Sequence, residues 1–264
     1  MSGQQSRLIE RINKRDKVIG CYEFIYETLD STMLQAKELA EKNFPEGTVV
    51  IAEEQTHGKG RNGRVWISPK GGLWLSIVLR PKIDISYMFI FSYIVSLSVA
   101  ETLQRIGVNP KIKWPNDILI ENKKVAGILI DSKSTDTEIE YIITGIGINV
   151  NNEIPELPEN AIEGTSIREY LGRKVDIERV KRYLYDSLEK NYSIIRKSKE
   201  NYVEILKKWD NFNFLKGRTV RIYDKSPSAP KLGKVIGINF NTGSLIVEVN
   251  SKKIELLDSA TIRT

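Results

Sequence analysis

One segment of the chain combines glycines with cations and an aromatic ring, in the sequence HGKGRNGRVW at residues 57–66. Glycine tolerates positive φ, so three glycines within six residues allow the backbone to bring its N–H groups close to a ligand. Lys59, Arg61 and Arg64 supply three positive charges, which suit a phosphate chain or a carboxylate. Trp66 offers an apolar wall for a ring. A solvated basic hairpin tip without a ligand has the same composition, so this segment alone does not decide between the two.

The same three glycines, Gly58, Gly60 and Gly63, satisfy the G-x-G-x-x-G pattern of dinucleotide-binding folds. That pattern requires a helix directly after it, whereas an apolar, strand-like run, Leu73–Arg80, follows here. No segment matches the G-x-x-x-x-G-K-S/T pattern of the P-loop. The sequence therefore excludes both of these nucleotide-binding folds.

A second candidate is the pentapeptide KWPND, Lys113–Asp117. Pro115 has no backbone N–H to donate to a neighbouring strand, so it marks a bulge or an edge in a sheet. Held at that break, Asn116 and Asp117 present an amide and a carboxylate, groups that suit polar ligand atoms or Mg²⁺. Pro-Asn-Asp is also good turn chemistry, and local composition by itself favours a simple turn.

Two further segments combine glycines with strand-forming residues. Lys124 enters an apolar strand, where its ammonium needs water or an anion unless the residue belongs to a charged hairpin turn. Strict alternation places Lys124 and Gly127 on opposite faces, so a pocket that both line requires a bend or a bulge. Gly145, Gly147 and Asn149 alternate onto one face, where a ligand or a helix can pack directly on the backbone.

Other chemistries are excluded by the residues that the chain lacks. His57 is the only histidine, which rules out a histidine metal cluster and leaves no second histidine as the base of a serine hydrolase. Cys21 is the only cysteine, so no internal disulfide forms, which fits a reducing cytoplasm.

The N-terminus has no signal-peptide core, and the most apolar run, Met88–Ala100, is too short for a membrane span. The net charge of +6 is compatible with nucleic acid, an anionic small molecule or an acidic protein as partner.

The candidate residues need strands and helices to position them, and 264 residues allow one large domain or two unequal ones. Apolar patterning predicts strands at Cys21–Glu27, Thr48–Glu53, Leu73–Arg80, Lys111–Trp114, Asp117–Glu121, Lys124–Asp131 and Glu140–Val150, the last two as antiparallel neighbours. Helical spacing predicts Leu34–Lys42, Met88–Ile106 and two or more helices within Val175–Trp209. A small barrel-like β domain is expected from the short strands Thr219–Tyr223, Gly233–Phe240, Ser244–Val249 and Lys252–Leu257. Residues 1–20 are expected to form a short helix or to stay unstructured.

The order of these segments resembles that of the biotin–protein ligases, whose successive signatures are similar to QTHGKGRNGRVWISPKGGLWLSIVLRP, KWPNDILIENKKVAGILID and GIGINVN. With Asp30-Ser31-Thr32 upstream, the resemblance covers residues 21–152, and a weaker match, KKWDNFNFLKGRTVRIYD, extends it. It implies an α+β fold: a basic extension (1–20), a mixed β-sheet catalytic domain backed by helices (21–212), and a C-terminal SH3-like β-barrel (213–264). It also implies two half-reactions. Biotin and MgATP give biotinyl-5′-AMP and pyrophosphate, and a lysine of an acceptor domain then takes the biotinyl group and releases AMP.

The resemblance also implies roles for individual residues. Arg61 and Lys124 are catalytic, because two anions meet during adenylation and cations offset their repulsion. The biotin-binding residues are Ser31, Thr32, Met33, Gln55, Gly58, Lys59, Gly60, Arg61, Lys124, Gly127 and Gly145. The ATP-binding residues are Arg61, Arg64, Trp66, Asn116, Asp117, Lys124 and Asn149. Mg²⁺ accompanies ATP, and its ligands are not assigned.

Three features depart from the family pattern. Met33 stands where the family usually has asparagine, and Lys59 replaces a commoner arginine. The N-terminal DNA-binding domain of the bifunctional members has no counterpart, so we expect no repressor activity and no DNA partner. The resemblance implies a biotin carboxyl carrier domain as the protein partner, no membrane partner and a cytoplasmic location. It leaves the oligomeric state open, a homodimer included.

Two alternatives remain at this point. A lipoate–protein ligase or octanoyltransferase shares the fold and the transfer of an acyl group to lysine, but the segment Lys59–Trp66 and the WPND tetrapeptide favour biotin. A non-enzymatic, basic nucleic-acid-binding protein with a β-barrel tail would bind DNA or RNA with an affinity that falls steeply with salt. The aromatic residues of this chain are not interleaved with basic ones in a recognisable nucleic-acid motif, which disfavours that alternative.

Overall fold

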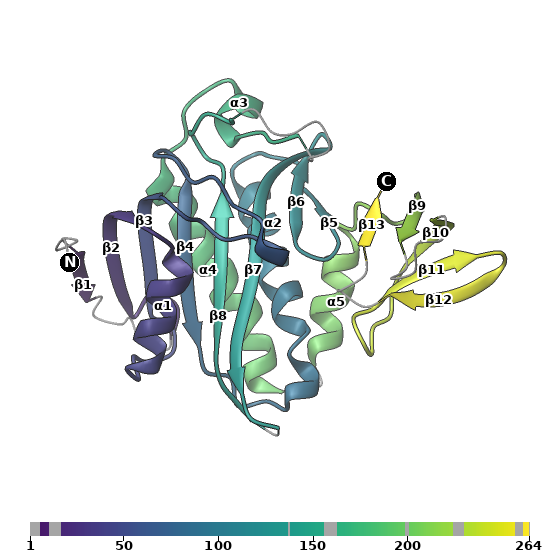
Figure 1. Cartoon of the computed structure of the whole chain (residues 1–264), viewed down its shortest axis with the longest axis horizontal. Helices are drawn as coiled ribbons and strands as arrows, with labels where there is room; N and C mark the ends of the chain where they lie inside the picture. The colour runs from purple at the N-terminus through teal and green to yellow at the C-terminus, as the bar shows by residue number, and fades with distance from the viewer. Residues whose placement is uncertain are drawn as a thin grey trace.

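The computed structural model describes residues 6–10, 17–136, 138–155, 163–198, 201–223, 230–256 and 261–263. They form a large and a small β-sheet with helices packed against the large one (Figure 1). The strands of the large sheet are β1 (Ser6–Glu10), β2 (Tyr22–Leu29), β3 (Val49–Gln55), β4 (Leu73–Leu79), β5 (Lys111–Lys113), β6 (Asp117–Ile120), β7 (Lys123–Ser134) and β8 (Ile139–Ile148). Those of the small sheet are β9 (Thr219–Tyr223), β10 (Lys231–Ile238), β11 (Leu245–Val249), β12 (Lys252–Leu256) and β13 (Thr261–Arg263). The helices are α1 (Thr32–Glu41), α2 (Ile90–Arg105), α3 (Ile167–Leu171), α4 (Ile177–Lys197) and α5 (Tyr202–Asp210), with 3-10 turns η1 (Arg61–Gly63) and η2 (Ile85–Tyr87).

The large sheet is mixed. Its order is β1-β2-β3-β4-β8-β7-β6-β5, and every neighbouring pair is antiparallel except β2 and β3. A parallel pair needs a crossover connection, which α1 provides between β2 and β3. The predicted α+β class and the predicted antiparallel pairing of β7 with β8 are confirmed.

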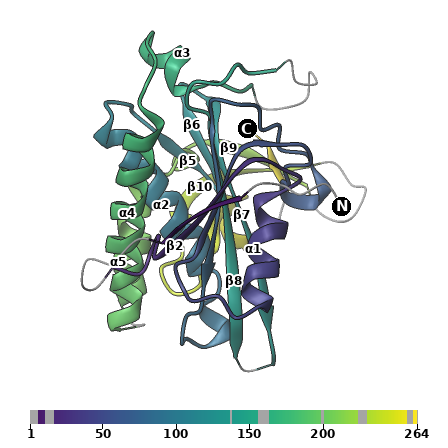
Figure 2. The same cartoon turned by 90° about the vertical axis from the view of Figure 1, so that its left-hand side faces the viewer.

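The two faces of the large sheet are covered by different helices (Figure 2). α1 packs on β3, β4 and β8 on one face, and α2 packs on β5, β6 and β7 on the other. α4 and α5 cover α2 from outside. α4 is amphipathic: Val180, Leu184 and Leu188 recur at a spacing of four residues and are all buried. The main core therefore lies between the sheet and α2, α4 and α5, and a smaller core lies under α1.

The structure corrects the expectation that the most apolar run, Met88–Ala100, is too short for a membrane span. That run is part of the longer stretch Ile85–Arg105, which by length and composition is long and apolar enough to span a membrane. Its helix, α2, is enclosed by the sheet on one side and by α4 and α5 on the other. Most side chains of α2 are consequently buried, whichever side of the helix they lie on, which explains its apolar composition. It is the central core helix of this fold.

The structure also corrects the expectation for the N-terminal segment. Ser6–Glu10, expected as a short helix or an unstructured chain, is strand β1 and pairs antiparallel with β2, with Ser6 opposite Tyr26. Without β1, β2 would be an edge strand with a row of unpaired N–H and C=O groups. Tertiary pairing of this kind outweighs local propensity, which is why local composition did not indicate it.

The small sheet has the order β12-β11-β10-β9-β13 and is antiparallel throughout. The four strands expected near the C-terminus are confirmed within a few residues at each end, and β13 is an additional one. The sheet is joined to the helical layer through α2, because the Tyr93 hydroxyl donates a hydrogen bond to the carbonyl of Gly243. Phe89 packs against the same glycine.

Candidate active site

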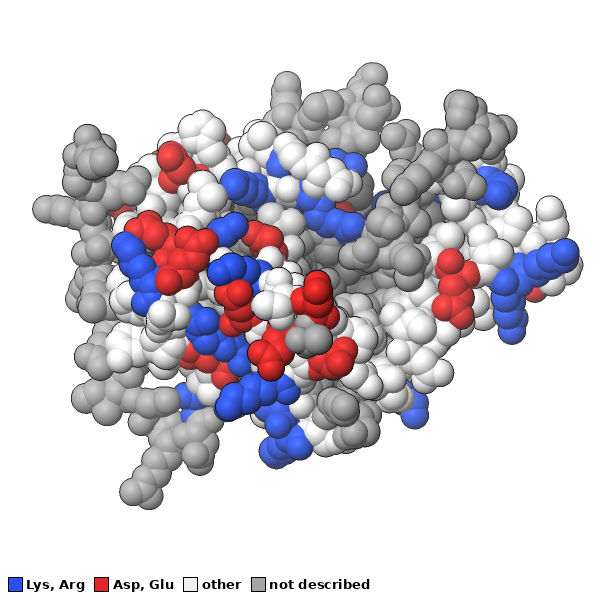
Figure 3. Space-filling model, turned by 60° about the horizontal axis from the view of Figure 1, so that its bottom comes forward, with Lys and Arg blue, Asp and Glu red and all other residues white. Residues whose placement is uncertain are grey.

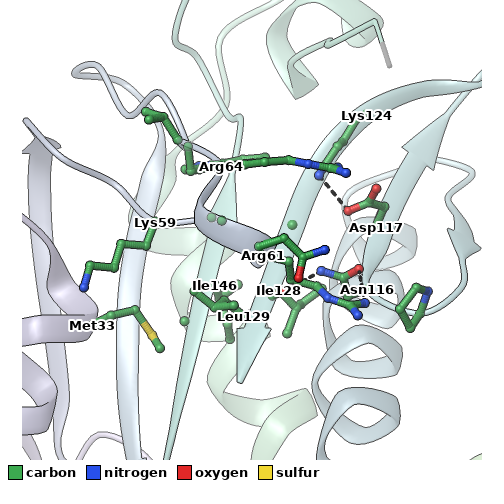
Figure 4. A pocket seen from close by; sticks show the side chains of 18 of the residues that line it. Met33, Lys59, Arg61, Arg64, Asn116, Asp117, Lys124, Ile128, Leu129 and Ile146 are labelled. Carbon is green, nitrogen blue, oxygen red and sulfur yellow. Dashed lines mark hydrogen bonds and ion pairs between the residues drawn. The ribbon is translucent and has the colours of Figure 1, made fainter. Parts of the chain in front are cut away.

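A cavity of about 250 Å³ lies on the α1 side of the large sheet, between residues 57–66 and strands β6, β7 and β8 (Figure 4). Its lining contains most of the predicted site residues: Thr32, Met33, Gln55, Lys59, Gly60, Arg61, Arg64, Trp66, Asn116, Asp117, Lys124, Gly127 and Gly145. It also contains residues to which no role was assigned: Asn62, Val65, Leu75, Lys113, Trp114, Pro115, Ile128, Leu129, Ile146 and Gly147. The fold thus brings together segments that lie more than 100 residues apart in the chain.

A row of opposed residues crosses the sheet beneath the cavity. Lys113 on β5 lies opposite Asp117 on β6. Asp117 lies opposite Gly127 on β7, and Gly127 lies opposite Gly147 on β8. Directly opposed residues of a sheet share a face. Two charged side chains and two glycines therefore face the cavity side by side.

The glycines of β8 allow side chains from other segments to lie directly on the backbone. A Cβ atom at Gly145 would lie under 3 Å from Met33 of α1. A Cβ at Gly147 would lie under 3 Å from the Trp66 ring. The prediction that these two glycines share one face is confirmed, because Met33 of α1 covers Gly145 and the Trp66 ring covers Gly147.

Lys124 and Gly127 both line the cavity because β7 bulges between them. The register of β7 against β6 skips Val125. One extra residue in a strand reverses the alternation of the side chains that follow it. The bulge that the sequence required for a shared pocket is therefore present.

The Lys124 ammonium is held by two groups. Its Nζ lies 2.6 Å from Oδ1 of Asp117 and 5.0 Å from the centroid of the Trp66 ring. The side chains of Lys124 and Asp117 are 23% and 19% exposed. A partly buried ammonium in this position attracts anions that enter the cavity.

Asn116 connects the segment 57–66 to strand β7. It follows a cis peptide bond between Trp114 and Pro115. Its Nδ2 donates to the carbonyl of Ile128 at 2.7 Å, and the Ile128 N–H donates to the Asn116 carbonyl at 3.1 Å. Its Oδ1 accepts a hydrogen bond from Arg61 at 3.3 Å. The simple turn that local composition favoured is thus part of the cavity wall.

The opposite end of the cavity is organised by Gln55. Its Oε1 accepts hydrogen bonds from the backbone N–H of Thr32 at 2.8 Å and from the Thr32 hydroxyl at 3.1 Å. Its Nε2 donates to Ser68 at 2.8 Å, and the Thr32 hydroxyl is also 2.8 Å from that of Ser76. These bonds fix the start of α1 against β3 and β4, which places Met33 in the cavity wall.

Three predicted residues do not line the cavity. The Ser31 hydroxyl is buried and has no hydrogen-bond partner in the part of the chain that the structure describes. Gly58 is buried within its own loop, where its carbonyl accepts from the Trp66 N–H at 2.8 Å. Asn149 lies one residue beyond β8, and its amide donates to the carbonyl of Thr165 at 3.1 Å. Their roles in ligand binding stay predictions.

The cavity is strongly positive. One carboxylate, Asp117, faces five cations in the lining: Lys59, Arg61, Arg64, Lys113 and Lys124. An excess of one charge within a recess concentrates ligands of the opposite sign. Across the described ranges, no three His, Cys, Asp or Glu side chains gather in a metal-binding group. The His57 side chain is 79% exposed.

Comparisons with known proteins agree with this geometry. Residues 24–149, which include every predicted site residue, match the Biotin/lipoate A/B protein ligase family. The chain is 33% identical over 261 residues to the bifunctional ligase/repressor BirA of Bacillus subtilis (strain 168), covering 97% of this chain and 79% of that protein. It is 32% identical over 155 residues to the biotin–[acetyl-CoA-carboxylase] ligase of Paracoccus denitrificans, covering 56% and 64%. The biotin protein ligase of Aquifex aeolicus in complex with biotin and ATP is similar in structure, with a TM-score of 0.77 and 29% identity over 91% of this chain and 98% of that one.

The mixed sheet and its cation-lined cavity define an acyl-transferring ligase of the biotin/lipoate class. Within that class, the chain belongs to the biotin–protein ligase family. The resemblance drawn from the sequence motifs is confirmed.

Proposed function

We propose that this chain attaches biotin to a lysine of a biotin carboxyl carrier domain, with biotinyl-5′-AMP as the intermediate. Relatives named for biotin ligation support the proposal, as does the similar structure bound to biotin and ATP. One observation carries it: a single cavity joins an end formed by Thr32, Met33 and Gln55 to an end formed by Arg61 and Lys124. An acid held at the first end places its carboxylate beside the cations, where the α-phosphate of ATP is also attracted.

In the first half-reaction, a carboxylate oxygen of biotin attacks the α-phosphorus of ATP. The bond from that phosphorus to the oxygen bridging to the β-phosphate breaks, and pyrophosphate leaves. Two anions must approach each other, so Arg61 and Lys124 lower the barrier by offsetting their repulsion. The step depends on positioning rather than on a protein nucleophile. Asp117 contributes by holding the Lys124 ammonium at 2.6 Å.

In the second half-reaction, the neutral amine of the acceptor lysine attacks the acyl carbon of biotinyl-5′-AMP. The bond between that carbon and the phosphate oxygen breaks, AMP leaves, and the new amide nitrogen loses a proton. Arg61 and Lys124 also stabilise the phosphate of AMP as it leaves, because its negative charge increases in this step.

We expect Mg²⁺ to bind together with ATP. When bound, the ion neutralises negative charge on the phosphates of ATP. Its preferred ligands are oxygens, and this wall of the cavity offers the side-chain oxygens of Asn116 and Asp117. Asn116 Oδ1 accepts from Arg61, and Asp117 Oδ1 pairs with Lys124. These residues fit a magnesium ion, which Asn116 and Asp117 would hold through their side-chain oxygens.

We also propose that the chain is divided into two domains. Residues 21–212 would form the catalytic domain, and residues 213–264 an SH3-like barrel. The short antiparallel strands of the small sheet support a barrel, as does the irregular register of β10 between Val235 and Gly237. Bulges of this kind increase the curvature that closes a small sheet.

Pyrophosphate release tests the choice of acid. The protein is incubated with MgATP and, separately, with biotin, lipoate or octanoate. We expect pyrophosphate with biotin only, accompanied by biotinyl-5′-AMP. Release with lipoate or octanoate but not with biotin would assign the chain to the other branch of the class.

Nucleic-acid binding receives less support. On the face shown in Figure 3, acidic side chains lie among the basic ones instead of leaving a continuous basic patch. Several exposed lysines are paired with carboxylates, as in Lys42–Glu38 and Lys133–Glu140. A salt-dependent affinity for DNA or RNA without pyrophosphate release would favour this alternative.

A further inference from the structure

Lys113 lines the cavity, yet neither the motifs nor the resemblance gave it a role. It is the last residue of β5, at the edge of the large sheet, and lies opposite Asp117. Opposed residues share a face, so its side chain lies on the cavity side of the sheet together with Asp117 and Gly127. Lys113 is half-buried.

Lys113 has no counter-ion in the described structure. The carboxylate opposite it, that of Asp117, is already paired with Lys124 at 2.6 Å. Within the described residues, Lys113 Nζ makes no hydrogen bond and no ion pair. Two lysines therefore lie beside one carboxylate, which pairs with Lys124 and leaves Lys113 without an ion pair in the described residues.

The surroundings of Lys113 favour the arrival of an anion. Burial lowers the pKa of the Lys113 ammonium from its usual value; the charge of Asp117 opposes this shift, and that of Lys124 adds to it. An unpaired, half-buried ammonium is unfavourable until a negative group approaches it. An anionic ligand in the cavity supplies that group.

Lys113 lies on the side of the cavity away from the end formed by Thr32 and Gln55. Met33 packs on Gly145 of β8, whereas Lys113 is on β5, three strands further along the sheet. Adjacent strands are about 4.8 Å apart, which separates the two positions by roughly 14 Å. Figure 4 shows Met33 on one side of the cavity and Asp117, the neighbour of Lys113 in the sheet, on the other.

The direction in which the leaving group departs from the α-phosphorus indicates which anion lies near Lys113. In-line attack places the leaving group on the opposite side of the phosphorus from the attacking carboxylate. With Arg61 and Lys124 at the reacting atoms, pyrophosphate leaves away from the acid and toward β5. We propose that Lys113 binds the β- and γ-phosphates of ATP and the pyrophosphate that they become. This role rests on the proposed function.

Pyrophosphate and preformed biotinyl-5′-AMP separate this role from the rest of the chemistry. Lys113→Met removes the charge and keeps the aliphatic stem, while Lys113→Arg keeps the charge. Lys82→Met removes an exposed charge outside the cavity as a control. Each full-length variant is assayed for ATP formation from biotinyl-5′-AMP and pyrophosphate, and for biotin transfer from biotinyl-5′-AMP to an acceptor domain without pyrophosphate. Calorimetry gives the Kd of inorganic pyrophosphate for the substrate-free protein.

Lys113→Met is expected to raise the KM and the Kd for pyrophosphate about tenfold or more, the loss expected for one hydrogen bond between charged groups. Biotin transfer should stay within about twofold of wild type. Lys113→Arg should restore most of the pyrophosphate affinity, and Lys82→Met should change neither reaction. The role of Lys113 would be overturned if Lys113→Met had an unchanged KM for pyrophosphate, or if it lost both reactions equally. In either case, turnover by the wild-type protein would leave the proposed function standing. A wild-type protein that carries out neither reaction would overturn the proposed function and this role with it.

Discussion

Lys124 is held by a carboxylate and an aromatic ring of the protein itself. A partly buried ion pair contributes little net stability, because the desolvation of both charges offsets their attraction. The contribution of Asp117 is therefore better understood as positioning. Catalysis by charge is most effective when the charged group needs no reorganisation during the reaction.

Lys124→Ala should reduce the rate of biotinyl-5′-AMP formation by about a hundredfold or more, the usual cost of losing one preorganised charge-stabilising group. A single-turnover assay with radiolabelled ATP measures it. Lys133→Ala is the matched control, because Lys133 is on the same strand but is exposed and pairs with Glu140. Wild-type rates in Lys124→Ala would refute the catalytic assignment.

Cys21 reports on the packing far from the cavity. Its Sγ donates to the carbonyl of Glu46 at 3.1 Å, and burial raises its pKa. The thiolate is the reactive form, so iodoacetamide should label the native protein more slowly than the protein in urea at neutral pH. The native rate should rise about tenfold per pH unit below the folded pKa. Mass spectrometry follows the label, and equal rates in the two states would contradict the packing.

At the scale of elements, the glycines of β8 and the bulge of β7 do the positioning. The glycine spacing lets Met33 and Trp66 lie on bare backbone, and the bulge turns Lys124 to the same face as Gly127. Both determine which side chains meet above the sheet.

Gly147→Ala should therefore impair the enzyme by displacing the Trp66 ring, since the added Cβ would lie under 3 Å from it. We expect a fall of about tenfold or more in adenylate formation, on the scale of a misplacement near reacting groups. Thermal unfolding checks that the fold persists. A second variant, Gly147→Ala with Trp66→Phe, has a smaller ring and should recover part of the activity. Full activity in the single variant would show that the position of the ring is unimportant.

Periodicity predicted these elements well because their patterns are local. The shared face of Gly145 and Gly147 follows from alternation, and the need for a bulge follows from comparing Lys124 with Gly127. The strand Ser6–Glu10 was not predicted, because its stability depends on a partner in β2. Alternation also predicted that Asn149 shares the face of these glycines. However, β8 ends one residue before Asn149, and the side-chain amide of Asn149 donates a hydrogen bond to the carbonyl of Thr165.

Some site residues cannot be found by local patterns at all. The cavity position of Lys113 depends on three strand pairings, and its missing counter-ion depends on the competition of Lys124 for Asp117. One signal was present in the sequence: Lys113 lies two residues before the break at Pro115. Its type and spacing, however, are those of any exposed lysine in a short strand.

At the scale of the whole molecule, α2 links the cavity to the small sheet. The Tyr93 hydroxyl donates to the carbonyl of Gly243 and accepts from Trp114 Nε1 at 3.1 Å. Trp114 is itself part of the cavity wall. A hydrogen-bonded chain thus runs from the small sheet through the core helix to the cavity.

Tyr93→Phe should lower the free energy of unfolding by about 1–3 kcal/mol, because two buried hydrogen-bonding groups lose their partner. Urea denaturation measures the change. Tyr183→Phe is the control: its hydroxyl accepts an exposed hydrogen bond from Arg179, and its loss should change the stability by less than about 0.5 kcal/mol. Equal stabilities of Tyr93→Phe and wild type would show that this link does not hold the parts together.

The central claim is that the cavity joins biotin to a protein lysine through an adenylate. The most direct measurement is mass spectrometry of a biotin carboxyl carrier domain after incubation with this protein, biotin and MgATP. We predict one added biotinyl group on one lysine, dependent on ATP and lost when that lysine is replaced by arginine. An acceptor of unchanged mass, when wild-type protein, biotin and MgATP are all present, would contradict the account.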